Sequence, residues 1–308
     1  MRFSLIVATA GRVVEVRELL ASLSNQTVQD FEVIVVDQNA DDRLGWLETE
    51  AFPFPIRRLR SGRRQLSHAR NLGLREAVGE IAAFPDDDCT YPSELLARVD
   101  ATFRERPGLG FCSGPSETPA GGLGSGRWRT RSGPIDAANV WTSVIEFNMF
   151  FRRAAVEAVG GFDERLGLGA RFGSAEGNDL ALRLVHTGWE GWYDFAQRAV
   201  HPDKRLTPAA TERAFSYGAG LGYALRKNMA PLGVRLNFLV RPLGGCLLNF
   251  ARGRWLAARY HWRALRGRIW GLCAAAGEDT GGLTMAARAR DISFRETHLQ
   301  RTSTRQGG

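Results

Sequence analysis

The sequence is poor in cysteine and lysine. Its four cysteines, Cys89, Cys112, Cys246 and Cys273, form no Cys-x-x-Cys pair and have no histidine at metal-ligand spacing. We therefore expect reduced, buried thiols in a protein of a reducing compartment. Only Lys204 and Lys227 are lysines among the 41 basic residues.

Long apolar runs are also missing. No stretch reaches about 18 uninterrupted apolar residues, so the sequence does not predict a transmembrane helix. The first run, residues 3–8, is too short for a signal peptide, and we expect it to form a strand instead. Hydrophobic and charged residues make up 44% and 24% of the chain, which argues against wholesale disorder. At 308 residues, one principal domain with an appendage is expected.

The net charge of +8 is unevenly distributed. From Pro202 onward, 18 basic residues face 6 acidic ones, whereas the first 201 residues contain 23 basic and 27 acidic residues. This asymmetry favours a basic C-terminal region facing an anionic partner, either nucleic acid or a phospholipid surface. The alternative is that the arginine excess partly reflects genome composition.

Short apolar runs alternate with helical periodicity in the first 90 residues. We predict strands at 5–8, 31–36, 56–59 and 81–84, with helices at 13–23 and 67–78, the second capped by Ser67. This alternation predicts an α/β fold with an open, mostly parallel sheet and helices on both faces. Ligands bind such sheets at the carboxyl ends of the strands. Thr9, Asp37 and the triplet 86–88 all stand at predicted strand ends.

The second half of the sequence has fewer clear elements. The Gly- and Ser-rich segment 115–134 is expected to be a long loop, either a lid or a linker. Strands are predicted at 147–151, 189–195 and 199–200, with helices at 153–159 and from Asp179 onward.

A basic helical appendage is predicted after His201. From Trp255 onward one helical face carries apolar residues and arginines flank it, which is typical of a helix in a membrane interface or packed on the main domain. The apolar face comprises Ala258, Trp262, Leu265, Ile269 and Leu272, and the flanks comprise Arg259, Arg263 and Arg266. Residues 277–308 are expected to form a flexible tail.

Three successive carboxylates, Asp86, Asp87 and Asp88, follow a buried strand. Like charges repel one another and lose hydration when buried, so a bound divalent cation would relieve this cost. Mg²⁺ usually takes one or two protein carboxylates and completes its shell with water and phosphate oxygens. Asp86 and Asp88 point to the same side of an extended segment, so we predict them as metal ligands. A solvated acidic turn is the alternative.

Further motifs stand in a fixed order around this triplet. They are Ser67-His68-Ala69-Arg70-Asn71-Leu72-Gly73, Phe147-Asn148-Met149, Gly160-Gly161-Phe162-Asp163-Glu164 and Glu176-Gly177-Asn178-Asp179-Leu180 followed by Arg183. With them, the chain up to about Lys227 resembles the family 2 glycosyltransferases of the GT-A fold. The resemblance implies transfer of a sugar, with inversion, from a nucleotide-diphosphate sugar to an acceptor hydroxyl. It also implies a divalent cation, Mn²⁺ or Mg²⁺, as cofactor.

Site roles follow from this resemblance. Thr9, Arg12 and Asp37 are expected to hold the nucleobase and ribose, although Arg12 as a surface charge and Asp37 as a turn cap are the alternatives. The resemblance adds further candidates. These are Arg70, Asp86, Asp87 and Asn148 for the nucleotide sugar, and Asp86, Asp88 and His201 for the metal, with an ordinary loop histidine as the alternative for His201.

The general base is the point at which the chain departs from the family. The common pattern is Glu-Asp-x-Asp-Leu with its first Asp as base, and Gly177 occupies that place here. An acceptor hydroxyl needs a carboxylate to take its proton. Glu176 and Asp179 remain as candidates, and we favour Glu176 because Asp179 is placed to cap its own helix.

We expect three regions: a catalytic domain at 1–227, a helical basic membrane-surface segment at 228–276 and the tail at 277–308. The expected partners are a nucleotide-sugar donor, a glycan or lipid-linked acceptor and an anionic membrane surface, with nucleic acid not expected. The expected location is cytoplasmic, on the inner face of the membrane, in cell-envelope or exopolysaccharide synthesis. The alternative function is a degenerate scaffold that binds an anionic surface.

Overall fold

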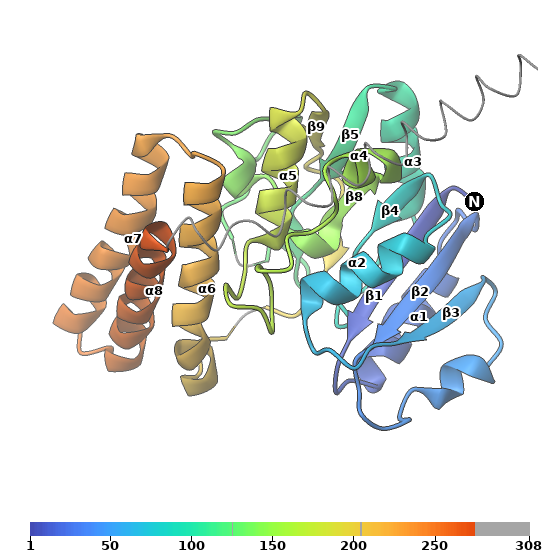
Figure 1. Cartoon of the computed structure of the whole chain (residues 1–308), viewed down its shortest axis with the longest axis horizontal. Coiled ribbons are helices and arrows are strands. Elements are labelled where there is room, and N and C mark those ends of the chain that lie inside the picture. The colour runs from blue at the N-terminus through green and yellow to red at the C-terminus, as the bar shows by residue number, and fades with distance from the viewer. Residues whose placement is uncertain (125, 204, 275–308) are drawn as a thin grey trace, which may run out of the picture.

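The computed structural model describes residues 1–124, 126–203 and 205–274 and contains an eight-stranded sheet (Figure 1). The strand order is β3-β2-β1-β4-β8-β5-β9-β7. β8 is antiparallel to both of its neighbours and β7 is antiparallel to β9, whereas all other pairs are parallel. The predicted α/β fold with a mostly parallel sheet is confirmed. The strands are β1 (Phe3–Thr9), β2 (Phe31–Asp37), β3 (Ile56–Arg60), β4 (Ile81–Ala83), β5 (Leu109–Ser113), β7 (Gly133–Ile135), β8 (Met149–Arg152) and β9 (Glu190–Tyr193).

Helices cover both faces of this sheet because its central strands, such as β1 and β2, are buried on both sides. In β1, Leu5 and Val7 point into one core while Ile6 points into the other. The helices around the sheet are α1 (Val14–Ser24), α2 (Leu66–Glu76), α3 (Leu95–Glu105), α4 (Arg153–Ala158) and α5 (Glu176–His186), with 3₁₀ turns η1 (Gly45–Glu48), η2 (Val140–Thr142) and η3 (Glu146–Asn148). A small second sheet pairs β6 (Ser116–Glu117) with β10 (Ala199–Val200), so the predicted loop 115–134 begins in a strand.

α2 lies unusually close to the sheet. A Cβ added at Gly73 would overlap the side chain of Ile6 in β1, so only glycine allows this approach. The helix begins at Leu66, and Ser67 does not cap it as predicted. Its hydroxyl instead donates a 2.6 Å hydrogen bond to the carbonyl of Leu166, which ties α2 to the loop before α5.

Three further helices form the C-terminal region: α6 (Pro208–Lys227), α7 (Leu232–Ala251) and α8 (Trp255–Cys273). Glycines bring the backbones of α6 and α8 into contact. Side chains added at Gly218 or Gly222 of α6 would collide with the backbone of α8. Another face of α6 meets the chain just before α5, because a side chain at Gly220 would strike the backbone of Ser174. α6 thus connects the helical region to the part of the main domain that carries Glu176.

The predicted apolar face of the last helix is wrong in part. Ala258 and Leu265 are buried, but Trp262 and Ile269 are about half exposed, since the buried seam of α8 consists mainly of small residues against α6. Among the described residues, no helix combines the length and the hydropathy needed to cross a bilayer. The tail predicted at 277–308 lies outside the described residues, and the region boundaries at 227 and 276 stay predictions.

The four cysteines are free, as expected, but only two of them are buried. Cys89 and Cys112 lie in the main core, and burial raises the pKa of both thiols. Cys246 is partly exposed and Cys273 is exposed, because both stand on the C-terminal helices rather than in the main domain.

Candidate active site

The ends of β1 and β4 bring the acidic triplet together with Thr9 and Arg12. Asp86 forms an isolated bridge with Ala8, so the chain after β4 continues alongside β1. The hydroxyl of Thr9 donates a 2.6 Å hydrogen bond to Asp87. Arg12 lies 2.6 Å from a carboxylate oxygen of Asp87 and 2.6 Å from one of Asp88. Thr9 therefore binds Asp87 alone, whereas Arg12 is shared between Asp87 and Asp88.

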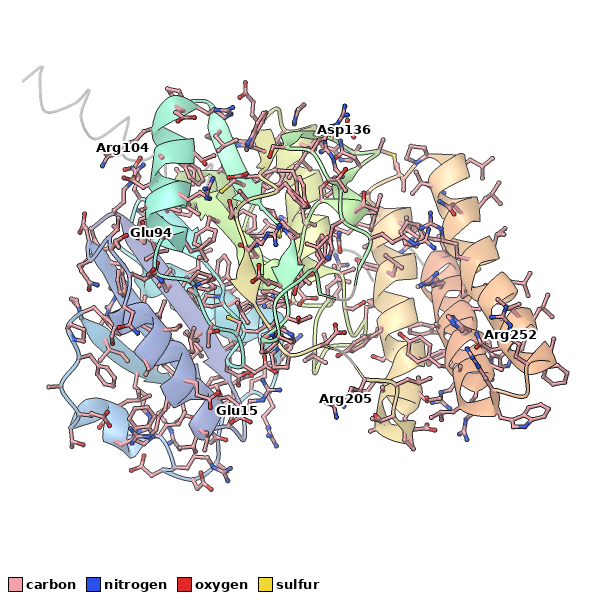
Figure 2. All side chains as sticks on the ribbon, turned by 180° about the vertical axis from the view of Figure 1, so that it is seen from behind. Glu15, Glu94, Arg104, Asp136, Arg205 and Arg252 are labelled. Carbon is pink, nitrogen blue, oxygen red and sulfur yellow. The ribbon has the colours of Figure 1, made fainter. Side chains whose placement is uncertain are left out.

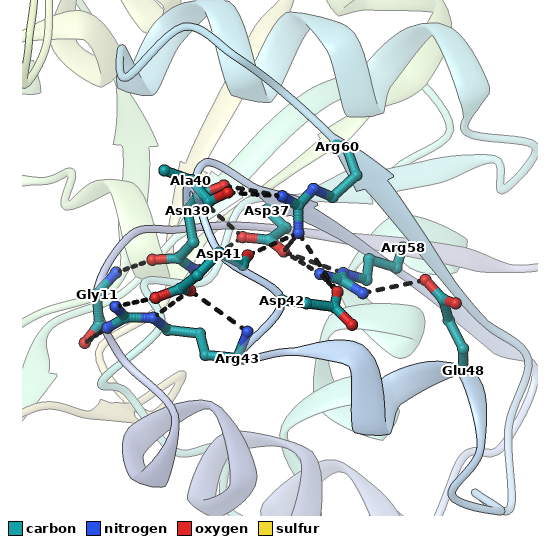
Figure 3. A network of polar contacts seen from close by, with 10 residues as sticks. All are labelled: Gly11, Asp37, Asn39, Ala40, Asp41, Asp42, Arg43, Glu48, Arg58 and Arg60. Carbon is teal, nitrogen blue, oxygen red and sulfur yellow. Dashed lines mark hydrogen bonds and ion pairs between the residues drawn. The ribbon is translucent and has the colours of Figure 1, made fainter.

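Asp37, at the end of β2, is completely buried at the centre of an arginine network (Figure 3). Arg58 donates to it from two nitrogens at 2.7 and 3.0 Å, and Asn39 donates from its backbone and its side chain. Burial opposes ionisation of Asp37, but these bonds outweigh it and lower its pKa. Asn39 also accepts a 2.6 Å hydrogen bond from the backbone of Gly11. The network thus joins the loops after β1 and β2, where the nucleobase and ribose were predicted to bind.

Asp86, Asp88 and His201 form an arrangement that could hold a metal ion. One ligand atom from each residue lies within 4.8 Å of the others. Nδ1 of His201 lies 2.7 Å from the carbonyl oxygen of Pro202, which can only accept, so Nδ1 carries the proton. Nε2 is then directed at Asp88, 3.2 Å away. The two carboxylates suit Mn²⁺ or Mg²⁺, whereas the imidazole nitrogen favours a transition metal such as Mn²⁺ over Mg²⁺.

Arg70 links this arrangement to the first turn of α5. It is almost completely buried, and its two terminal nitrogens bind Asp86 at 3.0 Å and Glu176 at 3.1 Å. Its guanidinium also lies over the ring of Phe162. The hydrogen bonds of Arg70 within the described residues go to these two carboxylates, and its predicted contact with the nucleotide stays a prediction. A planar guanidinium with several fixed donors is suited to holding two acidic groups at a set separation.

Glu176 has the environment of a proton-transfer group. Burial, together with the nearby charge of Glu146, raises its pKa to about 7. The preceding residue, Ala175, has a left-handed backbone with φ of 70°, which non-glycine residues rarely adopt. This conformation starts α5 and places Glu176 in its first turn, against Arg70.

Asp179, the other predicted base, belongs to a buried ionic network instead. It pairs with Arg183 at 2.9 Å and Lys227 at 2.9 Å, and it accepts a 2.9 Å hydrogen bond from Asn228. Burial opposes its ionisation, but these cations outweigh burial and lower its pKa. It does not cap α5 as predicted, because the helix begins at Glu176 and Asp179 lies within its first turn. We assign Asp179 to fixing α5 against the end of α6.

The side chain of Asn148 likewise makes its hydrogen bonds to other parts of the protein. It is completely buried, and its side-chain amide donates to the carbonyls of Pro115 and Gln197 at 3.0 and 2.8 Å. Gln197 returns two hydrogen bonds to Asn148. Both donor positions of the amide are therefore filled, and we assign Asn148 to holding the start of β8 rather than to the donor site.

Comparison with known proteins decides the family. The model of "Glycosyl transferase family 2" matches residues 4–159, about half of the chain. The chain belongs to glycosyltransferase family 2.

The glycosyltransferase is also similar to individual proteins. It is 32% identical over 115 residues to an uncharacterized glycosyltransferase of Haemophilus influenzae, and 33% identical over 116 residues to the uncharacterized glycosyltransferase YfnE of Bacillus subtilis. These matches cover 37% and 36% of this chain, but only 38% and 29% of the length of the two relatives. Each match therefore concerns little more than a third of this chain and less than half of either relative.

Solved structures resemble the glycosyltransferase over most of its length. The mannosyltransferase PcManGT from Pyrobaculum calidifontis, in complex with GDP-Man and Mn²⁺, has a TM-score of 0.59 at 20% identity, covering 98% of this chain and 83% of that one. S. aureus TarS 1–349, in complex with UDP-GlcNAc, has a TM-score of 0.56 at 17% identity, covering 88% of this chain and 91% of that one. At these identities the likeness concerns the fold.

Glu146 is a site residue that the sequence interpretation missed. A Cβ added at Gly177 would lie 2.5 Å from Cγ of Glu146, so Glu146 fills the space beside position 177. Among the described residues its carboxylate makes no hydrogen bond and no ion pair, although its charge acts on both Asp86 and Glu176. Gly177 was the one feature of the sequence that could have indicated Glu146. A glycine next to Glu176 leaves space for a side chain from elsewhere in the chain.

Proposed function

We propose that this glycosyltransferase is inverting and metal-dependent, and that it moves a sugar from a nucleotide-diphosphate donor to the hydroxyl of a glycan or lipid-linked acceptor. The observation that carries the proposal is that Arg70 bridges Asp86 and Glu176. Arg70 thereby holds Asp86, a candidate metal ligand, close to Glu176, the candidate general base. The UDP-GlcNAc and GDP-Man complexes of similar folds support a nucleotide-sugar donor.

Each residue has a defined task in this proposal. A divalent cation at Asp86, Asp88 and His201 would supply Lewis-acid stabilisation for the departing diphosphate. Glu176 takes the proton from the acceptor hydroxyl as its oxygen attacks the anomeric carbon. The bond to the leaving diphosphate breaks as the new bond forms on the opposite face of the sugar. One base and one displacement invert the anomeric configuration.

A pKa of about 7 suits Glu176 for the role of general base. A base must be ionised at the working pH and must still hold a proton well enough to take it from the hydroxyl. Arg70 keeps Glu176 oriented, while the unpaired charge of Glu146 opposes its ionisation. Glu176 is therefore the carboxylate that we assign as base, and Asp179 is not.

The charge asymmetry of the sequence supports a location on the inner face of the membrane, with envelope glycan, exopolysaccharide or glycolipid synthesis as the process. A degenerate scaffold that only binds an anionic surface is the second candidate. The observation in its favour is the stretch between Glu212 and Glu278, which has 11 basic residues and no acidic one.

The test is a panel of UDP-, GDP- and dTDP-sugars with Mn²⁺ or Mg²⁺, read by thermal shift and by release of free nucleotide. We expect one donor to raise the melting temperature only when the cation is present, with the gain lost on adding EDTA. Glu176→Gln should keep this gain while nucleotide release falls. A folded protein that responds to no donor would favour the degenerate scaffold. An anomeric product of retained configuration would contradict the inverting mechanism.

A further inference from the structure

One face of α7 is apolar and uncovered. Its six large apolar residues recur at spacings of three and four, so they form a continuous stripe along the helix. Their exposed fractions run from 43% to 71%. Soluble proteins rarely expose a contiguous apolar surface of this length unless it binds something. The α7 stripe comprises Leu232, Leu236, Val240, Leu243, Leu247 and Phe250.

The internal packing of the helical region does not need this stripe. α7 faces the rest of the molecule with other residues: Phe238 contacts Trp141, Pro242 is buried, and Gly245 lies against His261 of α8. α7 lies on the side of the helical region away from the sheet, with α8 and α6 between them (Figure 1). The side chains at this outer edge extend away from the protein in the opposite view as well (Figure 2).

Charge identifies the kind of surface that would cover the stripe. Arg241 of α7 and Arg252 at its C-terminal end are exposed, as is Arg254 beyond it. No acidic residue occurs between Glu212 and Glu278 to balance them. A second copy of the chain would bring the same positive charges to the contact, whereas anionic lipid headgroups would neutralise them.

Two aromatic residues mark the end of the stripe. Phe250 and Trp255 contact edge to face, with ring centroids 5.0 Å apart, and both are more than half exposed. Exposed tryptophan beside apolar and basic residues is typical of helices that lie in the headgroup region of a bilayer.

We propose that the α7 stripe docks this enzyme on an anionic membrane, with α7 lying along the lipid interface and its arginines on the headgroups. The inference deepens the membrane location given under the proposed function and rests on it. It moves the contact from α8, where the sequence placed it, to α7. The transfer reaction itself is not needed for this binding.

The test is sedimentation of the full chain with vesicles of phosphatidylcholine, with or without phosphatidylglycerol. We expect binding only to the anionic vesicles, and a loss of at least about tenfold in affinity for Leu236→Ser/Val240→Ser/Leu247→Ser. A matched control, Val14→Ser/Val78→Ser/Leu168→Ser, removes apolar groups of similar exposure elsewhere and should bind like the wild type. Arg241→Gln/Arg252→Gln should weaken binding by about fivefold per charge, unlike Arg104→Gln in α3.

Three results would overturn the proposal: no binding of the wild-type chain to anionic vesicles, equal binding by the stripe variant, or a dimer in light scattering that the stripe variant loses. The last result would assign the stripe to a second copy of the chain. Donor-dependent thermal stabilisation, measured on the same stripe variant, keeps the two hypotheses apart. If the stripe variant keeps this stabilisation but no longer binds vesicles, the result supports membrane docking by α7. If the wild type shows no stabilisation by any donor, the result contradicts the proposed reaction and leaves membrane docking unaffected.

Discussion

Glu146 and Gly177 share one volume beside the proposed base. A Cβ at position 177 would lie 2.5 Å from Cγ and 2.9 Å from Oε1 of Glu146, a separation that real Cβ atoms do not adopt. The glycine and the inserted glutamate are therefore coupled, although 30 positions separate them in the sequence. The carboxylate brought in by Glu146 then acts on the pKa of Glu176.

Gly177→Ala should destabilise the enzyme by about 1–3 kcal/mol, because the new methyl group must displace Glu146. In the double variant with Glu146→Ala, the methyl group has room and most of that loss should disappear. Denaturant unfolding of the wild type, both single variants and the double variant measures this coupling. Additive free-energy changes would show that the two positions do not share the space.

Glu146→Gln should lower the pKa of Glu176 from its value of about 7, because it removes a neighbouring negative charge. The acidic limb of the pH-rate profile should then move to lower pH. Glu157→Gln, an exposed substitution on α4, is the control and should leave the limb in place. If the acidic limb of the pH-rate profile stays in place in Glu146→Gln, the group whose ionisation controls the rate is not Glu176.

The same pKa makes a prediction about stability. Because the folded pKa of Glu176 lies above its ordinary value of 4.5, the folded state binds more protons than the unfolded state between these two values. Its contribution to the free energy of unfolding is present below about pH 4.5 and is lost as the pH rises through 7. Glu176→Gln should flatten this part of the profile of melting temperature against pH, measured without added cation.

The same substitution should also slow the reaction. Nucleotide release by Glu176→Gln should fall by about 10²–10⁴-fold, because the variant has no carboxylate to take the proton from the acceptor hydroxyl.

Local patterns were sufficient to predict the strands that end at the site. Residues 31–36 and 56–59 were predicted within one residue of β2 and β3. β2 is a buried parallel strand with a nearly continuous apolar run, whereas β3 is a partly exposed strand with only Ile56 and Leu59 as apolar residues. The grouping of Thr9 with the acidic triplet also followed, since neighbouring parallel strands end at one edge. Glu146 and Asp179 could not be assigned in this way. Their roles depend on contacts with Gly177 and Lys227, and no local spacing encodes contacts across 30 to 50 positions.

Lys227→Met should unfold the enzyme more easily while sparing the chemistry of the site. Its ammonium lies 2.7 Å from Asp163 and 2.9 Å from Asp179, both of them buried carboxylates. Removing one member of a buried ionic group leaves the other charges poorly compensated, at a cost of about 3–5 kcal/mol. Denaturant unfolding should show this loss, whereas Arg104→Met, at an exposed pair on α3, should change stability by less than about 1 kcal/mol. Equal midpoints for both variants would contradict the buried network.

Two substitutions should distinguish metal binding from loop binding within the acidic triplet: Asp88→Asn and Asp87→Asn. Asp88 belongs to the arrangement with Asp86 and His201, so Asp88→Asn should weaken Mn²⁺ binding by about tenfold or more. Asp87 lies outside this arrangement: it accepts a hydrogen bond from Thr9 and shares Arg12 with Asp88. Asp87→Asn should therefore keep most of the Mn²⁺ affinity while loosening the loop after β1. Titration of Mn²⁺ by electron paramagnetic resonance, without nucleotide, measures the cation alone. Equal loss of Mn²⁺ affinity in the two variants would mean that the whole triplet, and not the Asp86–Asp88–His201 arrangement, holds the metal.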